Sequence, residues 1–342
     1  MAFQNVGTMT LDASVMNNTG RVACVMDANG IASGQAFLVS ELEKRDTLVR
    51  TPLNSFTYGR DLPIRVGGGW DEFVSAVSVG YGVTGGSGDG LVHAPGANGI
   101  PMVQANFDKG TFKTHVVSAG TRVMWIDMQR GNITGRNLDT VLRDGLRLAY
   151  DKHMDQNAYV GFTAYGTTGL INNSGVTATQ AALNAGGTSR EFEDKTADEI
   201  LADINGAILD AWEAAEYDLD AIPNHIIMPY AQYNYLATTK VSQLAEKTIL
   251  TFLLENNVAT QNGSDLFIGA TLWCKGAGTG TTDRMVVYCN KERYVAMDEL
   301  VPLTRAMTSA NTEDFCFDTA YAANVSETEI FYTQPIVYVD GI

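Results

Sequence analysis

The stretch NLDTVLRDGLRLAYDKHMDQNAYVGFTAYGTTGLINN, residues 137–173, begins as an amphipathic helix and ends in a glycine-punctuated loop. Asn137 is expected to cap the helix, because its side-chain oxygen can accept a hydrogen bond from an unpaired first-turn amide. Gly161, Gly166 and Gly169 then end the helical pattern. Apolar or small residues at helical spacing predict one buried stripe: Leu138, Val141, Leu142, Gly145, Leu146, Ala149 and Met154.

The order of these parts resembles the major capsid proteins of tailed phages, which have the Hong Kong ninety-seven-type fold shared by encapsulin shells. In that family the helix, here residues 137–160, is the spine of the peripheral domain. Further segments resemble the axial domain and last strand of one branch: PNHIIMP (223–229), QYNYL (232–236), TILTFLLENN (248–257) and QPIVYVDGI (334–342). The similarity covers about residues 55–342. Ser174 departs from the pattern, where we expect proline, and this affects only a loop.

The resemblance implies an α+β capsid fold with distinct parts. The expected parts are an N-terminal arm (1–53), an extended β-hairpin loop (54–115), a peripheral domain with the spine helix (116–194), an axial α+β domain (195–300) and return strands to the peripheral domain (301–342). The family often carries a scaffolding segment before the arm. This chain has no room for one, so we expect any scaffold to be a separate protein or already removed.

Composition limits the function classes. A chain of 342 residues suggests about two domains, and only 18% of its residues are charged, which fits a protein that buries surface against neighbours. The net charge is −16, and no basic run occurs. Neutralising phosphates requires clustered Lys and Arg. We therefore expect no tight intrinsic binding of nucleic acid, even in a shell that encloses double-stranded DNA.

The cysteines and the N-terminus indicate a protein made and kept in a reducing cytoplasm. Cys24, Cys274, Cys289 and Cys316 show no metal-ligand spacing and are expected to be small buried apolar residues. The sequence contains no run long enough to span a bilayer and no signal peptide, so no membrane partner is expected. In the arm, residues 37–50 could form a short helix with Ser40 as its cap.

Residues 64–112 predict a long two-stranded hairpin. Val77, Val79, Tyr81 and Val83 alternate with small or polar residues, the pattern of a half-buried strand, and residues 85–99 form a glycine-rich tip. Two strands alone are marginal in water, so the apolar face is expected to find its partner on another subunit. The alternative, a hairpin folded on its own core, stays open. Residues 112–127 are expected to form a second strand region.

The segment 195–300 predicts a mixed α+β domain. Thr196 and Glu199 form a capping box at the start of a helix over 195–216. Its predicted core stripe is Ile200, Ile204, Ala207, Ile208, Ala211, Trp212 and Ala215. Strands are expected at 226–228, 266–274 and 285–289, helices at 231–237 and 249–256, mostly strands over 294–338, and a surface segment at 178–190.

Catalytic, cofactor and metal motifs fail on inspection, so none of their residues is predicted. Gly80–Gly85 matches GxGxxG, but glycines follow where a dinucleotide site needs a helix. Gly85–Asp89 falls one residue short of a GxSxG elbow. The adjacent carboxylates Asp71–Glu72 and Asp198–Glu199 suggest no acid–base pair. His153 is expected at a solvated or interface position. The histidines have no metal or triad spacing: His93, His115, His153 and His225.

With no catalytic motif left, the resemblance implies a structural protein, the coat subunit of a tailed double-stranded-DNA bacteriophage head, built as pentamers and hexamers. Its expected partners are copies of itself, with portal, scaffold and cement proteins, and its expected location is the virion. Some family members cross-link covalently through a loop lysine, and Lys109 is the candidate by position alone. An encapsulin-like compartment shell and, from a different class, a soluble α+β enzyme stay open as alternatives. Neighbouring genes would separate the two shell functions.

Overall fold

The structure is a computed structural model that describes residues 55–84, 102–134, 138–241 and 247–342. The chain separates into two compact units, Met1–Ser55 and Phe56–Ile342, and the second contains all the elements described below. Asn137, the arm helix predicted at 37–50, the hairpin tip at 85–99, Cys24 and His93 lie outside the described residues.

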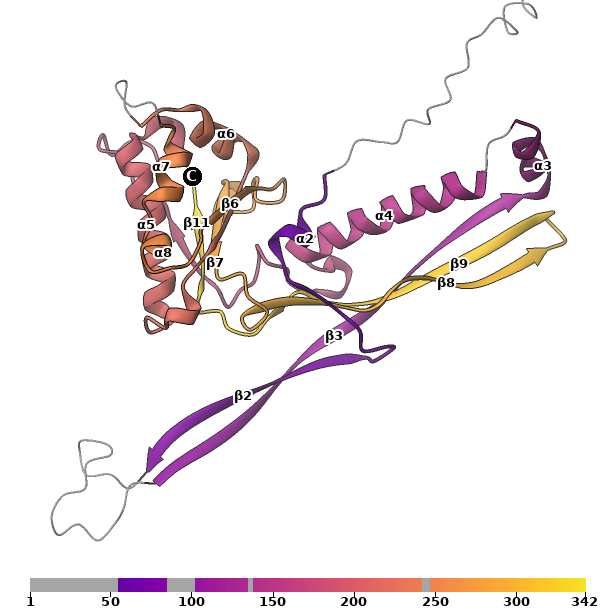
Figure 1. The fold of residues 1–342 in the computed structure, drawn as a ribbon, viewed down its shortest axis with the longest axis horizontal. Helices are drawn as coiled ribbons and strands as arrows, with labels where there is room; N and C mark the ends of the chain where they lie inside the picture. Colours follow the sequence, from indigo (N-terminus) through magenta and orange to yellow (C-terminus); the bar gives the residue numbers. More distant parts are fainter. Residues whose placement is uncertain (1–54, 85–101, 135–137, 242–246) are drawn as a thin grey trace, which may run out of the picture. The chain divides into compact units, whose positions relative to one another are not determined.

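One sheet carries the predicted hairpin (Figure 1). Its strand order is β1-β8-β9-β3-β2, with β10 added on β8. The hairpin strands β2 and β3 pair antiparallel from Phe73↔Lys113 to Thr84↔Met102. The elements of this region are α2 Tyr58–Asp61, β1 Ile64–Val66, β2 Phe73–Thr84, β3 Met102–Met124, α3 Trp125–Thr134, α4 Leu138–Val160, η2 Thr163–Tyr165, β8 Val295–Asn311, β9 Cys316–Ser326 and β10 Glu329–Ile330.

The strand region predicted at 112–127 is a strand from Phe112 to Met124, but it differs from the prediction in two respects. It is not a separate strand, because β3 runs unbroken over Met102–Met124 and exchanges its partner from β2 to β9 at Thr114. It also ends early, because α3 begins at Trp125. No turn residue separates Lys113 from Thr114, so the backbone has no reason to break there.

The other sheet has the order β4-β11-β7-β5-β6 (Figure 1). Its helical layer contains α5, whose buried residues pack with those of β5, β7 and β11 in one apolar cluster. The elements are β4 Thr177–Gln180, η3 Phe192–Asp194, α5 Ala197–Ala214, η4 Leu219–Ala221, β5 His225–Met228, α6 Tyr230–Thr238, α7 Ile249–Glu255, α8 Val258–Gln261, β6 Phe267–Ala270, η5 Thr279–Thr281, β7 Arg284–Tyr288 and β11 Ile336–Asp340.

Three sequence expectations about this second sheet differ from the structure. The surface segment 178–190 includes most of β4, an edge strand parallel to β11. The strand predicted at 266–274 stops at Ala270. The last strand, β11, does not return to the hairpin-bearing sheet, because it pairs with β7. Residues 301–342 are therefore divided between the two sheets.

The capping box of α5 is confirmed, because Thr196 Oγ1 accepts from Glu199 N and Glu199 Oε2 accepts from Thr196 N. The prediction that Trp212 is a core residue is wrong. Its ring is only partly buried, and its Nε1 donates to Asp218 O at 2.9 Å. Trp212 lies in the last turn of α5, where its ring meets Tyr217 edge-on at 5.4 Å and stays outside the apolar cluster of this sheet. The fully buried part of the stripe is Ile200, Ile204, Ala207, Ile208 and Ala211.

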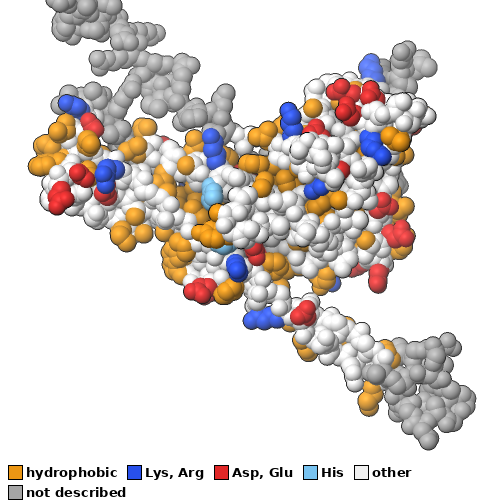
Figure 2. Space-filling model, turned by 180° about the vertical axis from the view of Figure 1, so that it is seen from behind, with side chains coloured by type: hydrophobic (Ala, Val, Ile, Leu, Met, Phe, Trp, Pro, Cys, Tyr) orange, Lys and Arg blue, Asp and Glu red, His pale blue; other side chains and the backbone are white. Residues whose placement is uncertain are grey.

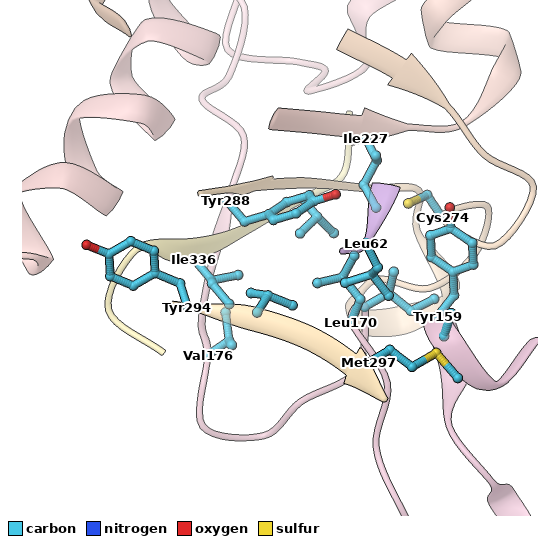
Figure 3. Packing of buried hydrophobic residues seen from close by; sticks show 14 of the residues in the cluster. Leu62, Tyr159, Leu170, Val176, Ile227, Cys274, Tyr288, Tyr294, Met297 and Ile336 are labelled. Atoms are coloured by element: carbon cyan, nitrogen blue, oxygen red, sulfur yellow. The ribbon is translucent and has the colours of Figure 1, made fainter. Parts of the chain in front are cut away.

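The spine helix α4 buries only part of its predicted stripe. Of that stripe Leu146 and Met154 are buried, as is Tyr150 outside it, whereas Val141, Gly145 and Ala149 are exposed. Burial increases toward the C-terminal half, where α4 joins the main apolar cluster. Figure 3 shows this cluster, in which Tyr159 and Leu170 from the α4 region meet Tyr288 from β7 and Met297 from β8. The cluster therefore ties both sheets to the spine helix.

Candidate assembly surfaces

The loop after the spine helix is fixed by its glycines and asparagines. A Cβ on Gly169 would lie 2.3 Å from the backbone C and O of Tyr159, so only glycine fits there. Asn172 Oδ1 accepts from Gly169 N at 2.6 Å, and Asn172 Nδ2 donates to Val160 O at 2.9 Å. Asn172 thus fastens the loop to the last turn of α4.

The same loop binds the second sheet. Tyr338 Oη of β11 donates to Leu170 O at 2.6 Å, and Arg284 Nη1 of β7 donates to Ile171 O at 2.6 Å. Arg284 also forms a bidentate pair with Asp340 at 2.6 and 2.9 Å. Burial opposes the charge of Asp340, but hydrogen bonds from Arg284 and Thr279 outweigh it and lower the Asp340 pKa. The stretch 137–173 therefore builds the joint between the two sheets, which is the region where the loop after α4 contacts β7 and β11.

A buried polar network strengthens this joint from the other side. The Asp61 carboxylate is fully buried and accepts from Arg60 at 2.6 and 2.9 Å and from the Tyr159 hydroxyl. His225 Nε2 lies 3.1 Å from Asp61 Oδ1, and Tyr288 Oη donates to Asp61 O. Burial raises the Asp61 pKa, but hydrogen bonds from His225, Arg60 and Tyr159 leave it lowered.

Sequence reasoning missed this network. Asp61 and His225 are 164 residues apart, and no local pattern links them. The other described histidines lie elsewhere, beside Phe162: the His115 ring is 4.6 Å from it and 4.5 Å from Tyr165, and the ring of exposed His153 is 5.4 Å from it. The structure therefore does not bring these three histidines into one site.

The strand register gives the hairpin one apolar face. Directly opposite residues in an antiparallel pair share a face. Val77, Val79, Tyr81 and Val83 therefore share a face with their partners Lys109, Phe107, Ala105 and Val103. The other face is small or polar, with Ser78 opposite Asp108, Gly80 opposite Asn106 and Gly82 opposite Gln104. Val103, Ala105 and Phe107 also alternate with polar residues, but the sequence prediction used this pattern only in the first strand.

The apolar face is open to solvent within the subunit. Tyr81 is 77% exposed, Phe107 69% and Val77 63%. Among the described residues, the hairpin contacts the rest of the fold at its root, where the Phe112 and Phe331 rings meet edge-on at 5.5 Å. The alternative of a hairpin folded on its own core therefore fails beyond the root. Within the segment 54–115, residues 58–66 belong to the body, and only β2 with the first half of β3 forms the hairpin.

Two stretches of β3 also have one backbone edge without a strand partner among the described residues. Met102–Lys113 pairs only with β2, and Thr114–Met124 pairs only with β9. Thr114 N donates to Glu72 O, whereas Glu327 N donates to Lys113 O, so β2 and β9 pair with opposite edges of β3. Beyond Thr114 the edge that faced β2 continues to Met124 without a strand partner among the described residues. Long unpaired edges are sites where another strand can add.

Further apolar side chains reach the surface at the far end of the first sheet and on the second. Figure 2 shows hydrophobic atoms spread over the surface among acidic and basic ones, without a basic tract on the face shown. The largest exposures outside the hairpin belong to Leu219, Tyr165, Phe315, Met307, Val66, Val116 and Leu272. Such exposed apolar surface is typical of a protein that associates.

Metal-ligating residues, cysteines and a glycine motif are the remaining candidates for chemistry in the part of the chain that the structure describes. No group of three or more His, Cys, Asp or Glu there could hold a metal ion. Cys274, Cys289 and Cys316 are free and buried, as predicted, and burial raises the pKa of each thiol, to about 11 for Cys289. Gly80 and Gly82 lie inside β2. Among the described helices, none is long and apolar enough to cross a membrane.

Comparison with known proteins agrees with this geometry. A family model described as "Major capsid protein" matches residues 90–342. The fold is similar to a solved structure titled "The capsid of Myoviridae Phage XM1", with a TM-score of 0.73 and 16% identity over 89% of this chain and 98% of that one. It is also similar to a chain of Microbacterium phage Oxtober96, with a TM-score of 0.58 and 10% identity over 90% and 98% of the two chains.

A third similar structure is titled "Capsid of empty GTA particle computed with C5 symmetry", with a TM-score of 0.54 and 12% identity over 90% of this chain and 97% of that one. A search of curated protein sequences found no match. The family model covers most of the chain, and the fold matches extend over nearly all of it. The chain therefore belongs to the major capsid protein family, and it is a structural subunit of a virion shell rather than an enzyme.

Proposed function

We propose that this chain builds the icosahedral head of a tailed double-stranded-DNA phage as pentamers and hexamers of itself. The observation that carries the proposal is the hairpin, whose apolar face is set by the strand register yet stays exposed among the described residues of its own subunit. A face of this kind is stable only if another molecule covers it. In a shell of identical subunits, the neighbouring copy is the available cover.

The energetics favour this use of the hairpin. Burying a Val, Phe or Tyr side chain contributes roughly 1.5–3 kcal/mol. The apolar face presents several such side chains, and the free edge of β3 adds backbone groups that a neighbour can pair with. The arm at 1–53 is proposed as a second clasp, and residues 195–300 are proposed to meet their copies around the capsomer axis. Portal, scaffold and cement proteins are the further partners that such a head requires.

The net charge supports a shell that encloses DNA without binding it tightly. With a net charge of −16, the subunit should repel phosphates, and a motor rather than the coat would drive packaging. Filter binding at moderate salt should show no affinity of micromolar strength. Micromolar or tighter binding with a steep salt dependence would contradict this part of the proposal.

Assembly itself is tested by size-exclusion chromatography with light scattering, followed by electron microscopy. The expected result is capsomers or closed shells, formed alone or with the cognate scaffold. A stable monomer at high concentration, with scaffold present, would overturn the proposal. A shell that copurifies with a cargo enzyme instead of portal protein would indicate a compartment rather than a phage head.

A further inference from the structure

The half of the first sheet beyond the hairpin root has two backbone edges of different character. This half consists of β8, β9 and β3, so one edge belongs to β8 and the other to β3 (Figure 1). The β8 strand contains Pro302, which has no backbone N–H, and its register with β9 shifts three times between Glu299 and Met307. Proline and β-bulges are the features by which edge strands resist pairing. The β8 edge is therefore protected.

The β3 edge has neither of these features. From Thr114 to Met124 the register with β9 runs without a shift, and this segment contains no proline. Thr114 N donates to Glu72 O on the side away from β9, and the backbone groups of an antiparallel strand alternate in direction. Four exposed residues therefore direct their N–H and C=O groups to the side that no described strand occupies: Val116, Ser118, Gly120 and Arg122.

The flank of α4 on the same side of the domain is also open. A row of exposed residues spaced by four follows this flank: Val141, Gly145, Ala149 and His153. The His153 ring lies 5.4 Å from Phe162, whose ring is 4.6 Å from His115 of β3. Tyr150, on the other side of the helix from Gly145, donates its hydroxyl to Glu299 of β8. The open row therefore lies toward the β3 edge and away from β8.

We propose that the β3 edge from Thr114 to Met124 pairs with the same edge of a second copy, and that the open α4 rows of the two copies meet beside this junction. The chain belongs to a family of shell subunits, so another copy is the available source of a strand. Because the β8 edge is protected, two copies of this half-sheet join through their β3 edges, which is an isologous contact. The joined sheet then ends on both sides at a protected β8 strand.

The residues along the edge fit such a contact. A twofold axis at Ala119, the middle of the segment, places Ser118 opposite Gly120 of the second copy and Arg122 opposite Val116. Like charges are therefore not opposed. Each Arg122 also donates to Asp318 of its own β9 at 2.8 and 3.0 Å, so its charge is neutralised within the subunit. The small residues at the centre let the two strands approach closely.

Amide hydrogen exchange on the full-length chain, compared between unassembled subunits and shells, tests the pairing. The amides of Val116, Ser118, Gly120 and Arg122 should exchange at least about tenfold more slowly in shells. The contact rests on the proposed function, because it forms between subunits of one shell. Shells in which these amides exchange as fast as in free subunits would overturn the edge pairing and leave the proposed function intact. A chain that forms no shells would overturn both.

A single cysteine substitution identifies the occupant of the edge. A short bis-maleimide added to shells should join two Ser118→Cys subunits, because their side chains lie beside a twofold axis. Ser309→Cys is the matched control: Ser309 is an exposed serine of β8, opposite Asp318 in the register, and should give no dimer. The wild type controls for the native cysteines. Protected amides without a Ser118→Cys dimer would mean that a different strand, such as one of a neighbour's hairpin, occupies the edge, and would overturn the pairing of like edges.

The helix contact is tested in the same assay. Gly145→Lys adds a side chain whose Cβ meets nothing within 4 Å in the subunit, so the fold should tolerate it. In the paired state it brings two cations together beside the junction, and the yield of the Ser118→Cys dimer should fall at least about fivefold. An unchanged yield would show that the α4 rows do not meet.

Discussion

The joint between the two sheets and the projecting hairpin differ in how far their polar and apolar groups find partners within the subunit. At the joint, Asp61 and Arg284 are fully engaged by partners from several elements, and the surrounding apolar residues are buried. On the hairpin, an equally regular apolar face remains exposed, and β3 has unpaired edges. The difference teaches that the subunit completes its joint alone and leaves its hairpin to be completed by assembly.

The largest effect on the subunit should come from breaking the joint at Asp61. Asp61→Ala should lower the free energy of unfolding by about 3–5 kcal/mol, because removing one partner of a buried charge network leaves the others unpaired. Denaturant unfolding of unassembled subunits measures it. Asp265→Ala, at an exposed carboxylate, is the control and should change stability by less than about 0.5 kcal/mol. A loss below about 1 kcal/mol at Asp61 would show that the network does not hold the joint.

A pair of glycines tests the loop that joins the spine helix to the second sheet. Gly169→Ala should cost about 3 kcal/mol, since its Cβ would meet the Tyr159 backbone. Gly206→Ala, in α5 with nothing within 4 Å of the added Cβ, should stabilise by roughly 0.5–1 kcal/mol. The same substitution should thus have opposite signs at the two sites in thermal unfolding. Equal shifts would mean that Gly169 is not confined as the structure indicates.

An intermediate effect is expected for Trp212. If Trp212 were a fully buried core residue, Trp212→Ala would cost about 3–5 kcal/mol, as for other buried aromatic residues. Its partial exposure lowers the expectation to about 1–2 kcal/mol, from reduced packing and the lost bond to Asp218 O. Ile204→Ala, at a fully buried position on the same helix, should cost more, about 2–5 kcal/mol. A larger loss at Trp212 than at Ile204 would restore the original prediction.

The smallest effect on the isolated subunit should come from the hairpin face. Tyr81→Ser with Phe107→Ser should change the free energy of unfolding by less than about 0.5 kcal/mol per site, because both side chains are exposed. Light scattering should show that the same variant no longer assembles. Gln104→Ser and Asn106→Ser, on the opposite face, should leave assembly unchanged, and a loss of assembly in both variants would mean that the apolar face is not the contact.

The contrast between the regions also explains what could be predicted from the sequence. Periodicity found the spine helix, the capping-box helix and the hairpin, because each is decided by residues close together in the chain. Periodicity failed where elements distant in sequence decide whether a residue is buried. Nothing near Trp212 shows that its ring stays outside the apolar cluster that α5 joins, and nothing near Val141 shows that its face of α4 remains exposed.

The joint could not be predicted from the sequence for the same reason. The Asp61–His225 contact and the Arg284–Asp340 pair join residues far apart in sequence, and each looks ordinary in its local surroundings. The partner exchange of β3 at Thr114 likewise depends on β9, about two hundred residues later. By contrast, the apolar face of β3 at Val103, Ala105 and Phe107 carries a local period of two and could have been found.

A shortened hairpin tests the central claim most directly. Residues 78–108, whose ends lie opposite each other in the register, would be replaced by an Asn-Gly turn between Val77 and Lys109. Unfolding and light scattering would then be measured on the same preparation. We predict a folded subunit, with an unfolding free energy within about 1 kcal/mol of the wild type, that forms no shells. A shortened chain that unfolds outright, or one that still assembles, would contradict the claim that the hairpin exists for the neighbouring subunit.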